Sequence, residues 1–124
     1  MAKQVILSSS APEPIGPYSQ AIMAGNMLFV SGQIALSNGQ MVNGNIKEET
    51  GQAMKNIEAI LKAAGLDFSH VVKSTIFLKN MGDFPQVNEI YGSFFKTNPP
   101  ARETVEVSRL PKDANVEISC IAVK

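Results

Sequence analysis

The last quarter of the chain contains two runs in which apolar and polar residues alternate, one on each side of Leu110-Pro111-Lys112-Asp113. Alternation with a period of two is typical of a β-strand with one buried face, and the proline and aspartate favour a turn between the two runs. The pattern predicts two strands joined as a hairpin. Such a hairpin would place Arg102, which follows a pair of prolines, and Glu117 on neighbouring strands.

The first 30 residues show the same period again. Residues Gln4–Ser8 are expected to form a first strand, and the prolines of Ser8–Pro17 predict an ordered loop after it. Ser19–Met23 and Met27–Val30 are strand-like runs on either side of Gly25-Asn26, a pair suited to the positive φ angles of a tight turn. We therefore expect another hairpin here.

A glycine interrupts the apolar run at the end of this hairpin, within Ser31-Gly32-Gln33. Glycine inside a strand marks either a β-bulge or a point where another group comes close to the backbone. The sequence leaves both interpretations open.

The period changes to that of a helix after residue 44. Asn45 can cap the start of this helix, with Glu48 three residues later, and Gly65 can end it. The apolar residues on one helical face are Ile46, Ala53, Met54, Ile57, Ile60, Leu61 and Ala64. The pattern predicts a long amphipathic helix.

The stretch Val71–Lys79 is rich in β-branched and aromatic residues and predicts a further strand. A second helix is expected from about Asp83, with Pro85 in its first turn, where proline is tolerated. Asn88 is expected at the rim of its buried stripe rather than in the core. That stripe is predicted to consist of Val87, Ile90, Tyr91, Phe94 and Phe95.

This order of elements predicts one α+β domain over residues 1–124, with a mixed or antiparallel six-stranded sheet and two helices on one sheet face. The other face still carries valine and isoleucine, and no helix is left to cover it. Self-association is therefore expected.

Composition and charge argue against several classes of function. The chain has 11 Lys+Arg and 11 Asp+Glu, so no long-range field attracts a polyanion, and nucleic acid is not an expected partner. Cys120 is the single cysteine, and together with His70 it offers too few ligands for a metal site. Without an apolar run long enough to span a bilayer or an apolar signal segment at its start, the chain is expected to be cytoplasmic.

Neither His70 nor Cys120 is expected to be catalytic. His70 precedes a strand, with no nucleophile and carboxylate arranged around it, and is expected at the surface. Cys120 lies in an apolar strand, where a buried and inert thiol is expected.

Arg102 and Glu117 are the strongest candidates for chemistry. A lone carboxylate in an apolar strand is costly without a partner, and desolvation would raise its pKa towards values useful in acid–base catalysis. A guanidinium can hold a small acid by two parallel hydrogen bonds. A structural salt bridge between Arg102 and Glu117 or Glu106 would explain the same pattern, so both interpretations stay open.

The sequence P-A-R-x-x-V-E-V-x-R-L-P-K-D-x-x-V-E-I resembles the C-terminal signature of the RidA (YjgF-like) family. Further segments resemble that family in order and spacing, so that nearly the whole chain is covered: Ile15–Gln20, Ser31–Ile34, Ala64–Leu66 and Phe84–Tyr91. The resemblance implies a chorismate-mutase-like fold, with three subunits closed into a barrel-like homotrimer and a cleft at each interface.

The resemblance also implies an activity, the hydrolysis of 2-imino acids such as 2-iminopropanoate and 2-iminobutanoate to 2-oxo acids and ammonia, without a cofactor. It implies that Arg102 binds the substrate carboxylate and that Glu117 positions or activates water. The other positions that match substrate-binding residues are Tyr18, Ser31, Gly32, Phe84, Asn88 and Thr104. Many family members carry cysteine at the position of Thr104, so an activity that needs that thiol is in doubt here.

Two other functions fit the same resemblance. One is a regulatory or chaperone-like trimer whose cleft binds a small ligand without turning it over, and the other is the ribonuclease or translation-inhibitor role attributed to relatives. The presence of both Arg102 and Glu117 favours the enzyme. Zero net charge and the lack of a basic stripe disfavour RNA.

Overall fold

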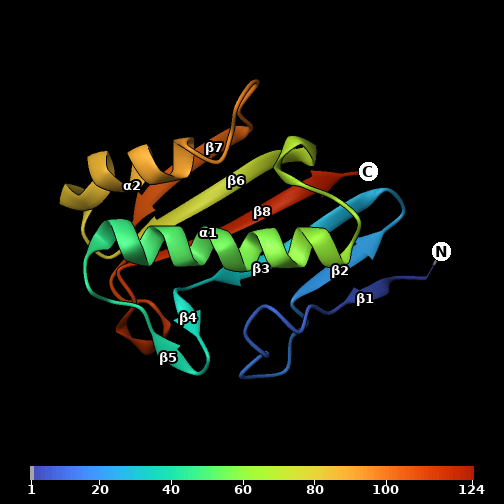
Figure 1. The fold of residues 1–124 in the computed structure, drawn as a ribbon, viewed down its shortest axis with the longest axis horizontal. Helices are drawn as coiled ribbons and strands as arrows, with labels where there is room; N and C mark the ends of the chain where they lie inside the picture. Colours follow the sequence, from blue (N-terminus) through green and yellow to red (C-terminus); the bar gives the residue numbers. More distant parts are fainter. Residues whose placement is uncertain (1) are drawn as a thin grey trace.

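The computed structural model describes residues 2–124 and contains a mixed six-stranded sheet with two helices on one of its faces (Figure 1). The sheet strands are β1 (Gln4–Ile6), β2 (Ala21–Ala24), β3 (Met27–Gln33), β6 (Val71–Leu78), β7 (Ala101–Glu106) and β8 (Val116–Val123). Their spatial order is β1-β2-β3-β8-β6-β7, and only β6 and β7 pair in parallel. The predicted α+β architecture is confirmed.

The helix α1 (Ile46–Ala63) crosses the sheet, and the shorter α2 (Phe84–Gly92) lies over the end of the sheet that carries β7 (Figure 1). Asn45 caps α1 by accepting a hydrogen bond of 2.9 Å from the backbone of Glu48, as predicted. Gly65 follows the helix with a φ of 77°, which suits a glycine at a helix end. None of the helices within residues 2–124 is long and apolar enough to cross a membrane.

The predicted buried stripe of the second helix needs one correction. Val87 and Tyr91 are buried in α2, but the helix ends at Gly92. Phe94 and Phe95 therefore lie beyond the helix, where they pack against Phe68. Three short 3₁₀ turns complete the helical elements: Phe68–His70, Met81–Asp83 and Pro111–Asp113.

The predicted hairpin near the N-terminus is confirmed. Ala24 pairs with Met27, and Gly25 between them has a φ of 62°. The first strand is shorter than predicted and ends at Ile6, because the backbone N–H of Ser8 donates to the side chain of Gln20 instead of to a strand. A small hairpin of β4 (Leu36–Ser37) and β5 (Gln40–Met41) was not predicted.

The hairpin predicted for the last quarter of the chain is wrong. β7 and β8 are not neighbours, because β6 lies between them and pairs in parallel with β7 and antiparallel with β8. The burial of the strands gives the reason. Every second residue of β8 is fully buried, which suits a central strand, whereas no residue of β7 is fully buried, which suits an edge.

The main core lies between the sheet and α1. Side chains of β8 that alternate towards the helices, such as Ile118 and Ala122, belong to the same core cluster as Ile57 and Leu61 of α1. On the other face, the side chains of Val5, Ile22, Phe29 and Ile121 stand in register across four strands. Phe29 is 42% exposed, so this apolar row remains open to solvent in the isolated chain, as the sequence predicted.

Candidate active site

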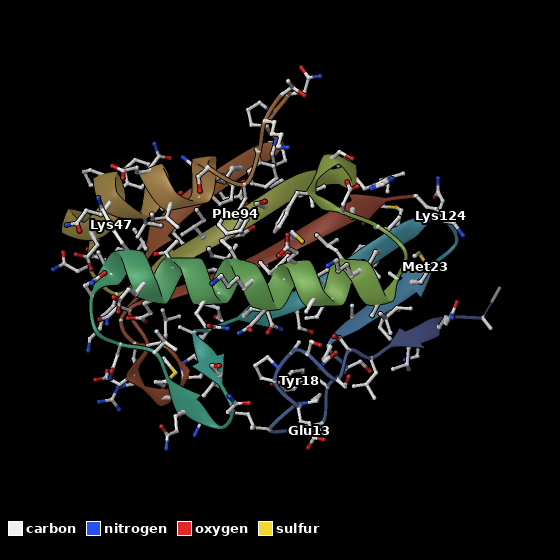
Figure 2. The ribbon with its side chains drawn as sticks, viewed as in Figure 1. Glu13, Tyr18, Met23, Lys47, Phe94 and Lys124 are labelled. Carbon is white, nitrogen blue, oxygen red and sulfur yellow. The ribbon has the colours of Figure 1, made fainter. Side chains whose placement is uncertain are left out.

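The structure gathers the eight predicted site residues into two groups. The pocket group consists of Tyr18, Ser31, Gly32 and Glu117, which line one pocket. The arginine group consists of Phe84, Asn88, Arg102 and Thr104, on α2 and β7. Figure 2 shows Tyr18 on the far side of α1 from Phe94, the second residue after α2. Arg102 and Glu117 are two strands apart, because β6 pairs with β7 at Ser74–Arg102 and with β8 at Phe77–Glu117.

The pocket group forms where β3 departs from regular pairing with β8. The register shifts between Val30 and Gln33, so the predicted bulge is present. The predicted close approach is present as well, because a Cβ built on Gly32 would be 2.7 Å from Oε2 of Glu117. The resulting pocket has a volume of about 340 Å³, and Pro12, Ile15 and Pro111 add apolar surface to it.

Glu117 brings a partly buried carboxyl group into this pocket. Burial raises the pKa of its carboxyl, as the sequence predicted. No side chain or backbone group within residues 2–124 forms a hydrogen bond or ion pair with this carboxylate. Its proton affinity is therefore increased by desolvation, with no donor to oppose the change.

In the pocket group, Ser31 is committed to the fold by its hydrogen bonds, whereas Tyr18 offers its ring to the pocket. Ser31 donates through its hydroxyl to the carbonyl of Ser19 at 2.6 Å and through its backbone N–H to the carbonyl of Gln20 at 2.9 Å. The Ser31 hydroxyl can therefore accept a hydrogen bond from a ligand but has no proton left to donate. Tyr18 is 48% exposed, and its ring is available as a pocket wall.

The arginine group is organised by one face of α2. Phe84, Asn88 and Tyr91 recur at helical spacing, and all three contact Arg102. The guanidinium carbon lies 5.4 Å from the ring centroid of Phe84 and 5.1 Å from that of Tyr91. Its Nη1 donates to Oδ1 of Asn88 at 2.7 Å, so the planar cation is held between two aromatic rings and an amide.

Arg102 has no carboxylate partner within residues 2–124. The ion pairs of lysine and arginine in this range are Lys47–Glu89, Lys73–Glu103 and Lys79–Asp113, and none of them includes Arg102. The structural alternative of a salt bridge to Glu117 or Glu106 is therefore not found. Glu106 instead accepts a hydrogen bond from the backbone of Met81.

Two buried hydroxyls accompany Arg102 without hydrogen-bond partners in the described chain, those of Tyr91 and Thr104. Burial raises the pKa of Tyr91. Sequence reasoning placed Tyr91 only in the core stripe, although its spacing of three residues from Asn88 and seven from Phe84 was the signal that all three share one face.

Cys120 and His70, which the sequence predicted to be non-catalytic, lie where that prediction placed them. Cys120 is buried, and burial raises the pKa of its thiol to about 12. His70 ends a 3₁₀ turn at the surface, where its Nδ1 accepts a hydrogen bond from the backbone of Asp67.

Arg102 and Glu117 point to opposite faces of the sheet. Arg102 faces the helices, because its guanidinium contacts three side chains of α2. Glu117 faces away from them, because its neighbours Val116 and Ile118 are buried in the core on the helix side. The prediction that they lie on neighbouring strands is wrong, because β6 lies between β7 and β8. Since the two side chains also face opposite sides of the sheet, one isolated chain cannot bring both to the same ligand.

The fold defines the class of protein. The chain superimposes on a solved structure of a conserved Rid family protein from Yersinia pestis with a TM-score of 0.97 and 49% sequence identity, covering 99% of this chain and 100% of that one. The family model described as Endoribonuclease L-PSP matches residues 8–124. The chain belongs to this family, the YjgF/RidA family.

Two relatives show how far the similarity extends. A RutC family protein from Pyrococcus horikoshii is 53% identical over 98% of each chain. The human 2-iminobutanoate/2-iminopropanoate deaminase is 47% identical, covering 100% of this chain and 92% of the human protein.

Proposed function

We propose that this protein is an enamine/imine deaminase. It hydrolyses 2-imino acids such as 2-iminopropanoate and 2-iminobutanoate to 2-oxo acids and ammonia, and it acts in the cytoplasm without a cofactor. The similarity to the human deaminase supports this assignment.

The observation that carries the proposal is that the guanidinium of Arg102 is held in a fixed orientation without a paired carboxylate. Two rings and an amide orient its guanidinium, yet no carboxylate within residues 2–124 pairs with it. An oriented guanidinium without an internal anion is suited to hold the carboxylate of a small acid.

The proposed site is shared between copies of the chain in a homotrimer. Since Arg102 and Glu117 face opposite sides of one sheet, the carboxylate anchor of one copy would meet the pocket group of another. The open apolar row that includes Phe29 supports assembly, because contact with a second copy would remove it from water.

In the proposed reaction, Arg102 holds the substrate carboxylate while water attacks the imine carbon. Glu117 accepts a proton from that water and returns it to the imine nitrogen, which gives the carbinolamine. It then moves the hydroxyl proton of the carbinolamine to the amino group, and the carbon–nitrogen bond breaks to release ammonia and the 2-oxo acid. The raised pKa of Glu117 suits this role, because a stronger base accepts the proton more readily.

The direct test generates an imino acid in the presence of the protein, using an amino-acid oxidase or a dehydratase, and measures release of 2-oxo acid and ammonia against the uncatalysed rate. Faster release supports the proposal. Binding of pyruvate without faster release contradicts it and favours a regulatory trimer. The net charge of zero gives no support to an RNA substrate.

A further inference from the structure

Two buried side-chain amides each hold one wall of the pocket that contains Glu117. Gln20 is 1% exposed and Asn56 is 2% exposed. Neither residue has an assigned role in the proposed reaction, and both form most of their hydrogen bonds to backbone that lies outside the six-stranded sheet.

Gln20 fixes the segment that follows β1. Its Oε1 accepts from the N–H of Ser8 at 2.7 Å, and its Nε2 donates to the carbonyls of Pro12 at 2.9 Å and Ser8 at 3.1 Å, with a longer contact of 3.5 Å to Ala11. This segment leads into Pro12 and Ile15, which line the pocket. The wall is therefore tied to β2 through one side chain.

Asn56, on α1, fixes a second segment of the pocket lining. Its Nδ2 donates to the carbonyls of Ile34 and Leu36, both at 3.0 Å, and its Oδ1 accepts from Gln52 at 2.9 Å. Ile34 and Leu36 also line the pocket. The second wall is therefore tied to the helix that packs on the sheet.

Both walls present apolar side chains, and both consist largely of backbone outside the main sheet. Backbone without ladder partners depends on side-chain hydrogen bonds for its position. Loss of a buried amide removes the hydrogen bonds that tie these carbonyls to the packed core, so the wall that it held is expected to move outwards to water.

We infer that Gln20 and Asn56 are positioning residues that set the width of this pocket and so limit the size of the substrate side chain. The inference rests on the proposed function, because it places the side chain of the imino acid between the two apolar walls.

The test compares the parent protein with Gln20→Met and Asn56→Ser on imino acids derived from alanine, 2-aminobutanoate and leucine. The KM of the smallest substrate is expected to rise about tenfold, with kcat changed less than about twofold, since a pocket wall contributes similarly to the ground state and the transition state. The preference for the alanine-derived over the leucine-derived substrate is expected to fall about tenfold. Asn56→Ser keeps the inference testable if Gln20→Met does not fold.

Met54→Ala is the control for a general loss of stability. Met54 is 1% exposed in α1 and does not line the pocket. It should lower the melting temperature without changing substrate preference. Variants at Gln20 and Asn56 that behave like this control, or that lose kcat at unchanged KM and preference, would overturn the inference.

Calorimetry with pyruvate, 2-oxobutanoate and 4-methyl-2-oxopentanoate separates this inference from the proposed function. If the parent protein binds these acids without hydrolysing imines, the proposed function fails. A shift in the affinity ratio towards the larger acid in both variants would still support the inference, and an unchanged ratio would overturn it.

Discussion

The carboxylate of Glu117 occupies the space that a side chain at Gly32 would need. A Cβ built on Gly32 would be 2.7 Å from Oε2 and 2.8 Å from the carboxyl carbon of Glu117, closer than real contacts allow. The bulge in β3 and the acid on β8 therefore form one unit, in which the missing side chain makes room for the carboxylate.

Gly32→Ala is expected to displace the Glu117 carboxylate and to lower imine turnover about 10²-fold, because a shift of about 1 Å can have that effect on a positioned group. Turnover and melting temperature should be measured together. Gly92→Ala is the matched control, since a Cβ built on Gly92 would meet no neighbouring atom within 4 Å. Parent-like turnover in Gly32→Ala would contradict a catalytic role for the carboxylate at this place.

Glu117→Gln is expected to lower turnover about 10² to 10⁴-fold, the usual effect of losing a general acid or base. Steady-state kinetics of imine hydrolysis provides the measurement. Parent-level turnover would mean that another group manages the water.

Glu117→Gln should also stabilise the fold at neutral pH. Burial raises the pKa of Glu117, so the folded state holds this proton more tightly than the unfolded state. The free energy of unfolding therefore falls as the pH rises from the ordinary pKa of 4.5 to the raised folded pKa, and this loss is constant above that. The melting temperature of Glu117→Gln should exceed that of the parent at pH 7. The difference should shrink as the pH falls through the raised folded pKa and should be lost below the ordinary pKa of 4.5. An equal difference at both pH values would show that the effect is not one of charge.

Arg102→Lys keeps a cation but loses the planar fork, so activity and pyruvate binding should fall together. Arg102→Ala should cost more, about 2–5 kcal/mol in transition-state stabilisation. Imine hydrolysis, pyruvate binding, mass and melting temperature should be measured for both variants. A folded and intact Arg102→Ala assembly with the parent rate would remove Arg102 from the mechanism.

Phe29→Asp places a charge in the open apolar row and should dissociate the proposed trimer, because an unpaired charge in an interface is costly. Light scattering at micromolar concentration gives the mass. Lys55→Asp on the exposed side of α1 is the control and should leave the mass unchanged. A parent that is a stable monomer would contradict the shared site.

Local patterns in the sequence were enough to predict most elements. The capping of α1 by Asn45, the turn at Gly25 and the bulge at Gly32 depend on a few adjacent residues, and all three are present in the structure. The raised pKa of Glu117 also followed from a local feature, a lone acid in an apolar strand.

Strand order was harder to predict, because it depends on which strands compete for the centre of the sheet. The turn residues after Leu110 favoured a hairpin, but burial of β8 between β3 and β6 outweighed that local preference. This error also misplaced Arg102 relative to Glu117. The walls held by Gln20 and Asn56 were not predicted either, since buried amides bonded to irregular loops have no periodic signature.

The opposite orientation of Arg102 and Glu117 has a genetic consequence if copies share each site. Arg102→Ala chains retain the pocket group and Glu117→Gln chains retain the arginine group, so two inactive proteins would complement each other when they assemble together. If equal amounts of the two variant chains mix at random, about a quarter of the clefts would contain both an intact Arg102 and an intact Glu117. Each of these residues is intact in about half of the chains, and each cleft takes them from two different chains. An organism with one gene copy for each of these two variants would then keep part of an activity that neither gene provides alone.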